Sequence, residues 1–250
     1  MSSYTSLEAL LHDAFWATEE SPELAWIDAI LTRRPGRALE IGCGSGRLLL
    51  PLVQKGHRID GIDLSADMLA LCRSAAAALG VEPVLHHGDM TTFSPPQPYE
   101  ILLVPAFTLQ LAGDPAAALR HFHQLLVPGG LLYLTVFVPL AEIHRELPEN
   151  TWYPDHQTTL PDGRKASVET RHRIDRKQRL LLREHLYQLS GPDGVIEHRC
   201  EETIRWFTPR TLARVLKESG FKVTQAVADF DDDIPVTDEA QILTVLAERC

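Results

Sequence analysis

The chain has 250 residues, which is enough for one large domain or for one domain with a sizeable insertion. Its hydrophobic fraction of 44% and charged fraction of 23% are typical of globular proteins, and no apolar run approaches the roughly 20 residues that cross a bilayer. The formal net charge of -10 argues against nucleic acid as a partner, because such binding depends on neutralising phosphates.

The first half of the chain alternates short apolar runs typical of strands with patterns typical of helices. Alternation of strands with helices predicts a parallel sheet covered by helices on both faces. The sequence LVPGG at 126–130 is a turn signal that precedes the last of these strands. The strand-like runs are 37–41, 57–63, 82–87, 100–105 and 130–138, and the helical patterns cover 46–55, 66–79 and 115–126.

The stretch ALEIGCGSGRLLL places three glycines, Gly42, Gly44 and Gly46, where the first strand turns into the first helix. We expect this helix to start near Ser45 and to tolerate Pro51 close to its beginning. Glycine lets the backbone turn tightly and approach a ligand, and a helix N-terminus offers unpaired N–H groups. The stretch therefore predicts a ligand-binding loop.

The residues around the glycines distinguish three ligand classes. A phosphate-binding loop needs Lys after its last glycine and a dinucleotide fingerprint needs Gly or Ala at its sixth position, but Arg47 occupies both places. The third class is S-adenosylmethionine, which has a carboxylate and an ammonium and no phosphate. Glu40 favours it, since a carboxylate would repel pyrophosphate by on the order of 1 kcal/mol or more and would attract an ammonium. A solvated acid at a strand end is the alternative interpretation.

Two further acids follow the next two predicted strands. Asp63 ends the second strand and can accept hydrogen bonds from an adenosine ribose, a feature shared with nicotinamide enzymes. Asp89 follows the third strand and can accept a hydrogen bond from an adenine amine, with Met90 beside the ring; an ordinary loop aspartate is the alternative. Both positions belong to the carboxyl ends of strands, where ligands bind open α/β sheets.

The pattern changes after Pro139. Between 157 and 206, β-friendly runs are separated by the turn sequences PDG and GPDG, which predicts three antiparallel strands inserted into the parallel domain. A helix follows, with Thr208 as its N-cap and Gly220 just beyond its end. Two more strands are expected at 221–230 and 241–248.

Residues 38–75, together with GDM at 88–90, resemble the first half of the S-adenosylmethionine-dependent methyltransferases with a Rossmann-like fold. The likeness covers residues 20–140. It resumes at the segment RWFTPRTLARVLKESGFKV and continues to the end of the chain. It implies an α/β fold with a seven-stranded, mostly parallel sheet in the order 3-2-1-4-5-7-6, strand 7 being antiparallel, with helices on both faces and a three-stranded antiparallel insertion. It implies three parts: 1–140, N-terminal lid helices and the cofactor-binding half; 141–206, the antiparallel substrate cap; and 207–250, the last helix and the strands that complete the sheet.

The resemblance implies S-adenosyl-L-methionine as cofactor and methylation of a small-molecule acceptor on nitrogen or oxygen. The chain departs from the family at Val104-Pro105-Ala106-Phe107, which lacks the N-P-P-Y or D-P-P-Y of enzymes that methylate bases or glutamine amides. This departure argues against those substrates. The cofactor contacts that the resemblance implies are Glu40, Gly42, Cys43, Gly44, Asp63, Leu64, Met68, Asp89, Met90, Pro105 and Phe107.

The acceptor site is less clearly marked, because the sequence contains no evident catalytic dyad. Glu142 and His144 follow the fifth strand and are weak candidates for a general base. Residues 164–183 hold eight basic side chains against two acids, which either recruit an anionic substrate or form a charged solvent face. The aromatic side chains expected to contact the acceptor, with core packing as the alternative, are Tyr4, Trp16, Trp152 and Tyr153.

Two other functions stay open: a same-fold enzyme that uses S-adenosylmethionine for non-methylating chemistry, and a cofactor-binding subunit without catalysis. The four cysteines are scattered and include no C-x-x-C pair, which argues against disulfides and against a zinc site. The chain begins without a basic segment followed by an apolar one, so no signal peptide is expected. We expect a cytoplasmic protein with no metal and no membrane partner; a homodimer is one of the oligomeric states left open.

Overall fold

The computed structural model describes residues 6–16, 22–192, 194–231 and 233–250. The chain forms two compact units. The antiparallel unit joins the N-terminal segment through Glu20 to Pro139–Trp206, and the parallel-sheet unit joins Ser21–Val138 to Phe207–Cys250. The N-terminal helix α1 (Ser6–Trp16) thus groups with the insertion, whereas the sequence placed it with the cofactor-binding half. Within the described residues, no helix is both long enough and apolar enough to span a membrane.

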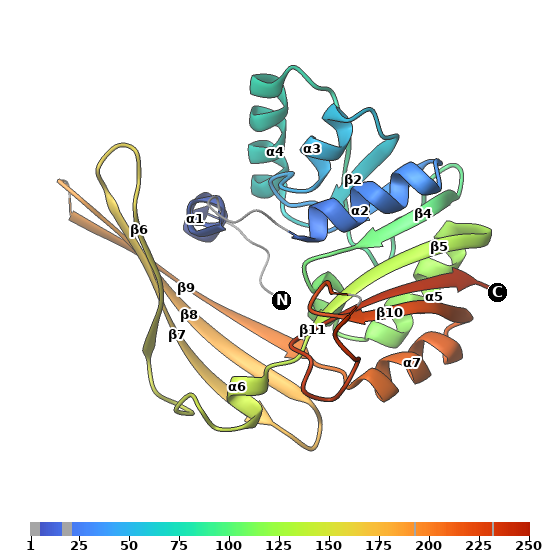
Figure 1. The fold of residues 1–250 in the computed structure, drawn as a ribbon. Coiled ribbons are helices and arrows are strands. Elements are labelled where there is room, and N and C mark those ends of the chain that lie inside the picture. The colour runs from blue at the N-terminus through green and yellow to red at the C-terminus, as the bar shows by residue number, and fades with distance from the viewer. Residues whose placement is uncertain (1–5, 17–21, 193, 232) are drawn as a thin grey trace. The chain divides into compact units, whose positions relative to one another are not determined.

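Seven strands of the parallel-sheet unit form one sheet: β1 (Ala38–Ile41), β2 (Ile59–Asp63), β3 (Val84–His87), β4 (Tyr99–Val104), β5 (Leu126–Phe137), β10 (Phe221–Ala228) and β11 (Ile242–Arg249). Their order is β10-β11-β5-β4-β1-β2-β3 (Figure 1). The first five strands pair in parallel, whereas β11 pairs antiparallel with both β5 and β10. The predicted order 3-2-1-4-5-7-6, with an antiparallel strand 7, is therefore confirmed.

Helices cover both faces of this sheet. One apolar core cluster joins α2 (Pro22–Arg33), α3 (Leu49–Gln54) and α4 (Ala66–Leu79) to alternate residues of the central strands, including Ile101, Leu103 and Tyr133. Helices α5 (Pro115–Leu125) and α7 (Pro209–Glu218) lie next to each other along the β5, β10 and β11 side (Figure 1). The alternation arises because successive strand side chains point to opposite faces.

The predicted N-cap Thr208 is confirmed, and α4 also has caps of residue types typical of helix ends. Ser65 caps α4 through a hydrogen bond from Met68 N, and Gly80 ends that helix in the left-handed conformation. Thr208 caps α7 with a reciprocal Thr208–Thr211 capping box. One helix start differs from the expectation near Ser45, because α3 begins at Leu49. Pro51 then lies in the first turn, where its missing N–H has no intrahelical partner to lose.

The LVPGG segment also differs from the simple turn predicted for it. It belongs to β5, and the pairing with β4 jumps from Tyr99–Leu126 to Ile101–Leu131. Between these pairs, four residues of β5 (127–130) therefore oppose one residue of β4, and the extra residues form a bulge that contains Gly129 at a φ of 69°.

The antiparallel unit has one four-stranded sheet, in the order β6 (Tyr153–Thr159), β7 (Lys165–Asp175), β8 (Leu180–Gly191) and β9 (Gly194–Arg205). The prediction of three strands was wrong, because it missed the edge strand β6. The sequence of this strand, YPDHQTT, is polar, and its pairing with β7 has a bulge next to Pro154. Such a strand lacks the apolar alternation by which strands are recognised. Helix α1 packs within this unit through Leu7 and Leu11 against Ala166 and Leu189.

Candidate functional site

The loop between β1 and α3 is tied to the end of β2. The amides of Gly42 and Cys43 both donate to the carbonyl of Ile62, at 2.8 and 3.0 Å. The amide of Gly44 donates to Oδ2 of Asp63 at 2.8 Å. These hydrogen bonds fix the conformation of the loop at the carboxyl edge of the sheet, which is where ligands bind this class of fold.

Gly42 can be only a glycine in this arrangement. Its φ of 74° is one that L-residues rarely adopt, and a Cβ there would lie 2.7 Å from Cγ2 of Thr108, a residue that follows β4. The loops after β1 and β4 therefore approach each other at this glycine. Thr108 itself is held by a hydrogen bond from its Oγ1 to the carbonyl of Pro105 at 2.8 Å.

Glu40 is the most unusual residue of the loop region. Its side chain is 2% exposed at the end of β1, and its Oε2 has no hydrogen-bond partner among the residues that the structure describes. Burial raises the pKa of this carboxyl well above its usual value, and the charge of Glu23 raises it further, although Arg47 works in the opposite direction. A buried carboxylate oxygen without a donor favours a cation or a strong donor from outside the chain.

Glu23, in the first turn of α2, was not identified from the sequence. It is buried, and its Oε1 accepts hydrogen bonds from Thr135 Oγ1 at 2.9 Å, Tyr133 OH at 3.2 Å and Ala106 N at 3.3 Å. Burial nevertheless raises the pKa of Glu23. In sequence it looks like any acid in a first helical turn, so only the tertiary contacts reveal its role.

The other two predicted acids occupy the ends of neighbouring strands. Asp63 accepts from Gly44 N through Oδ2 and from Ser65 N through Oδ1, each at 2.8 Å. Asp89 accepts from both the amide and the hydroxyl of Thr91 through Oδ1, at 2.8 and 2.6 Å. Gly88 N donates to the Asp63 carbonyl, which places the two loops side by side. The structure therefore brings these acids to one edge of the sheet; their ligand contacts stay predictions.

The segment after β4 has an unusual backbone. Ala106 and Phe107 both have positive φ, of 49° and 64°, in a region that non-glycine residues seldom adopt. The Ala106 amide is held by Glu23, and the Phe107 ring lies 5.6 Å from that of Phe137. Backbone outliers of this kind cluster at ligand sites. Pro105, just before them, is buried.

The remaining predicted cofactor contacts lie in the same loops and differ in exposure. Met68 is 4% exposed and Leu64 41% exposed, and Met90 is intermediate. Cys43 is buried against Gly61, and burial raises the pKa of its thiol strongly. A thiol in that state is a packing group rather than a nucleophile.

The acceptor candidates divide by location. Tyr4 and the side chain of Trp16 lie outside the described residues. Trp152 is half-buried, with the guanidinium of Arg171 4.9 Å from its ring centroid. The hydroxyl of Tyr153 lies 3.4 Å from Nδ1 of His172, and burial raises the pKa of Tyr153 to about 12.

The two candidates for a general base are in different environments. Glu142, on the short helix α6 (Leu140–Ile143), is buried and accepts a hydrogen bond from Arg183 Nη2 at 2.7 Å. His144 is exposed and lies 4.0 Å from Glu146. The structure thus does not bring them together as a pair. Their proposed catalytic role stays a prediction.

One face of the antiparallel sheet holds a polar network that the sequence did not reveal. Arg183 lies between Glu142 and Glu202, and His185 contacts Glu202 at 3.2 Å and Thr170 at 2.8 Å. Burial works to raise the pKa of Glu202, but the hydrogen bond to His185 and the charges of His185 and Arg183 lower it overall. These groups come from α6, β7, β8 and β9, so periodicity alone does not place them together.

Four of the eight basic side chains at 164–183, Arg183 among them, form ion pairs with acids of the antiparallel unit. Arg164 pairs with Asp162, Arg171 with Glu184, and Arg176 with Glu149. These pairs favour the interpretation as a solvent face that is neutralised locally over that of an open wall for anions.

Comparison with known proteins adds three findings. A family model described as a methyltransferase domain matches residues 15–226. The chain is 27% identical to the dTDP-3-amino-3,6-dideoxy-alpha-D-glucopyranose N,N-dimethyltransferase of Streptomyces fradiae over 215 residues. This alignment covers 80% of this chain and 77% of that enzyme. Over 111 residues it is 30% identical to the ubiquinone biosynthesis O-methyltransferase of Pseudomonas aeruginosa, 44% of this chain and 48% of that enzyme.

Solved structures share the fold at low identity. An S-adenosylmethionine-dependent methyltransferase from Clostridium acetobutylicum superposes with a TM-score of 0.79 at 14% identity, over 96% of this chain and 97% of that one. An amino pentose methyltransferase from Micromonospora echinaspora, solved with S-adenosylmethionine bound, gives a TM-score of 0.70 at 22% identity, over 100% and 99% of the two chains. These likenesses concern the fold.

Proposed function

This chain belongs to the methyltransferase-domain family, and we propose that it transfers a methyl group from S-adenosylmethionine to an amine or hydroxyl of a small polar acceptor. The family match covers most of the chain, including strands β1 to β9. The acceptor class is inferred from relatives, whose names describe N,N-dimethylation of an amino sugar and O-methylation in ubiquinone biosynthesis.

The observation that supports the cofactor assignment is that Oε2 of Glu40 has no hydrogen-bond partner among the described residues. A buried carboxylate in this state is stabilised by a cation, and it would repel the pyrophosphate of a dinucleotide. The α-ammonium of S-adenosylmethionine is a cation of the right kind for this position. The donors and acceptors present therefore fit this cofactor.

The same loops offer further contacts of suitable chemistry. Both oxygens of Asp63 accept hydrogen bonds from backbone amides, and a carboxylate is also a suitable acceptor for a ribose hydroxyl. The glycine loop lets the backbone approach without a Cβ. When bound, the cofactor supplies the methyl group on its sulfonium sulfur. The task of this chain is then to align the reactants and exclude water.

The antiparallel unit contains a candidate for contact with the acceptor. Nε2 of His172 is buried and has no hydrogen-bond partner within the described part of the chain. Burial lowers the pKa of His172, so the imidazole is neutral at neutral pH and can accept a proton or a hydrogen bond. An acceptor amine reacts only when unprotonated, and a hydroxyl benefits from a base, so a neutral imidazole suits either.

Calorimetric titration tests the cofactor assignment. Purified protein is titrated with S-adenosylmethionine, S-adenosylhomocysteine and NAD, alongside the variants Glu40→Gln and Glu82→Gln. Glu82 is an exposed glutamate outside the loops and serves as the matched control. We expect both sulfur ligands to bind wild type and Glu82→Gln, and Glu40→Gln to bind at least tenfold more weakly, about 1.4 kcal/mol. Tight NAD binding without a response to either sulfur ligand would overturn the assignment.

Product analysis tests the reaction. The protein is incubated with S-adenosylmethionine and either nucleotide-activated amino sugars or phenolic quinone precursors, with mass-spectrometric detection. A methylated product formed together with S-adenosylhomocysteine supports methyl transfer. Consumption of the cofactor with any other adenosine product would instead support the non-methylating alternative. For an active acceptor, His172→Asn is expected to lower kcat with S-adenosylmethionine affinity unchanged.

A further inference from the structure

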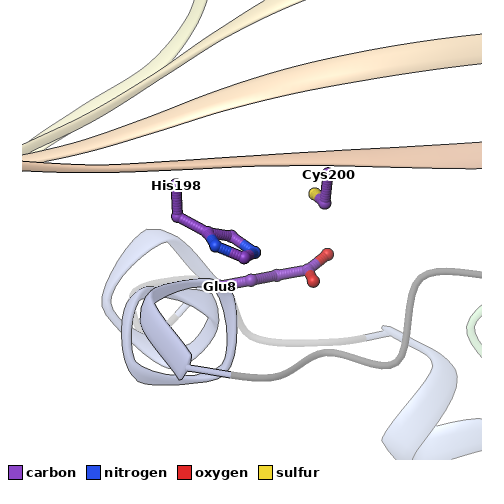
Figure 2. Close-up of side chains that lie close together, drawn as sticks. All are labelled: Glu8, His198 and Cys200. Carbon is purple, nitrogen blue, oxygen red and sulfur yellow. The ribbon is translucent and has the colours of Figure 1, made fainter.

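Three side chains with metal-binding atoms converge within the antiparallel unit, next to the polar network described above, since Cys200 pairs across the strands with His185. They are Glu8 on α1 and His198 and Cys200 on β9, and their ligand atoms all lie within 4.8 Å of one another. Figure 2 shows His198 and Cys200 projecting from the same side of β9 toward the Glu8 carboxylate. Residues two apart on a strand share a face, which explains why these two point together.

The helix that supplies Glu8 is held against the sheet by apolar contacts on either side of it. Leu7 and Leu11 are buried with Ala166 and Leu189. Glu8 lies between these two leucines in the chain and is only 4% exposed. Its carboxylate is therefore held in place near His198 and Cys200 of β9.

We propose that Glu8, His198 and Cys200 bind a zinc ion, or another borderline transition-metal ion in its place. A thiolate, an imidazole and a carboxylate are all established ligands of zinc, whereas magnesium and calcium prefer oxygen ligands alone. Tetrahedral zinc at the usual bond lengths holds its ligand atoms roughly 3.4–3.8 Å apart. Side-chain rotations that move these atoms by about 1 Å would therefore bring them to the distances that zinc requires. Three protein ligands leave the fourth position to water.

The sequence argued against a zinc site because the cysteines form no C-x-x-C pair. That argument concerns ligands that are neighbours in the chain. Here one ligand comes from the N-terminal helix and two from a strand near residue 200, and only the fold brings them together. Binding releases the Cys200 proton to solvent, because the thiolate is the ligand. The ion would then clip α1 to β9, adding a link to a helix that is otherwise held by a small apolar cluster.

The test uses the full chain, stripped of metal with a chelator and kept reduced. Zinc binding is measured by calorimetry, and cobalt is used as a spectroscopic probe, since thiolate coordination gives a charge-transfer absorption. We expect one zinc per chain, the charge-transfer band with cobalt, and slower amide exchange in α1 when zinc is present. Cys200→Ser should abolish the band, and His198→Ala and Glu8→Gln should each weaken zinc binding roughly tenfold or more.

Cys250→Ser is the matched control, because that cysteine is exposed at the end of the parallel-sheet unit. It should bind both metals as wild type does. Circular dichroism of each metal-free variant checks that it is folded, and Cys200→Ala gives a second, apolar replacement. Equal zinc affinity in wild type and in folded Cys200→Ser or Cys200→Ala would overturn the proposal, as would cobalt binding without a charge-transfer band.

Discussion

Glu23 and Glu40 are buried acids whose charges interact: the charge of Glu23 raises the pKa of Glu40. They differ in how their oxygens are satisfied. Oε1 of Glu23 accepts three hydrogen bonds from the chain itself, whereas Oε2 of Glu40 has no partner among the described residues. Glu23 therefore stabilises the fold, whereas Glu40 is the buried acid that is available to bind a ligand.

The buried Glu40 should make the stability of the ligand-free protein depend on pH. Its folded-state pKa lies above its unfolded value, so between the two the native state binds more protons, and stability falls as pH rises through the folded pKa. Replacement by Gln removes this dependence. We expect the melting temperature of Glu40→Gln, relative to wild type, to rise between about pH 5 and about pH 8.

Thermal melts of the ligand-free proteins across that range measure the effect. Glu82→Gln, at an exposed position, should follow wild type throughout. A constant difference between Glu40→Gln and wild type at every pH would show that Glu40 has no raised pKa.

Glu23 should be a positioning residue for the strained segment after β4. Glu23→Ala leaves the buried donors Thr135 and Tyr133 and the Ala106 amide without an acceptor, which should lower the free energy of unfolding by about 1–3 kcal/mol. Releasing the Ala106 amide should also weaken cofactor affinity, because the positive φ values there are no longer supported.

Glu23→Gln keeps a carbonyl oxygen of the same reach and is the matched control. Chemical denaturation and calorimetry with S-adenosylmethionine give the two readouts. We expect Glu23→Gln to recover most of the stability and affinity lost in Glu23→Ala. If Glu23→Ala lost stability and kept wild-type affinity, Glu23 would support only the fold.

Alanine substitutions at Gly42 and Gly80 distinguish the cost of steric crowding from the cost of backbone strain. Both have positive φ, 74° and 67°, but a Cβ at Gly42 meets Thr108 at 2.7 Å whereas one at Gly80 has nothing within 4 Å. Gly80→Ala should therefore show only the left-handed strain of about 1–2 kcal/mol. Gly42→Ala should lower the free energy of unfolding by more than this and should impair cofactor binding, as denaturation and titration can measure. Equal losses in the two variants would mean that Thr108 moves aside freely.

The parallel-sheet unit was largely predictable from sequence because its signals are local. Apolar runs alternate with helical patterns, and caps such as Ser65 and Thr208 mark where helices start. The errors fell where local signals are weak or misleading. Strand β6 is polar and lies at an edge, and the LVPGG segment joins β5 through a bulge that sequence cannot distinguish from a turn.

The candidate site was predictable to the extent that its residues follow strands. Glu40, Asp63 and Asp89 could be identified because the carboxyl ends of parallel strands meet at one edge. Glu23, the Arg183 network and the Glu8–His198–Cys200 cluster could not, since each depends on contacts between residues distant in the chain. No periodic pattern encodes such contacts.

Arg183 should be the ionic residue on which the antiparallel unit depends most. Its side chain is largely buried between Glu142 and Glu202. Arg183→Met leaves the buried carboxylate of Glu142 without this cation and leaves Glu202 with His185 as its partner. Breaking a pair of this kind should lower the free energy of unfolding by on the order of 3 kcal/mol. The loss should shrink in mildly acidic buffer, because the charge of Arg183 lowers the pKa of Glu202 and this contribution to stability disappears as the carboxyl is protonated.

Urea denaturation at neutral and mildly acidic pH measures both effects. Arg164→Met is the matched control: Arg164 and Asp162 have side chains 37% and 51% exposed, so that pair should contribute little to the free energy of unfolding at either pH. Similar losses in the two variants, or a loss in Arg183→Met that does not change with pH, would mean that Arg183 contributes through its aliphatic stem and not through its charge. In the expected case, the polar face of the antiparallel sheet is held by this cation, which keeps Glu202 ionised together with His185.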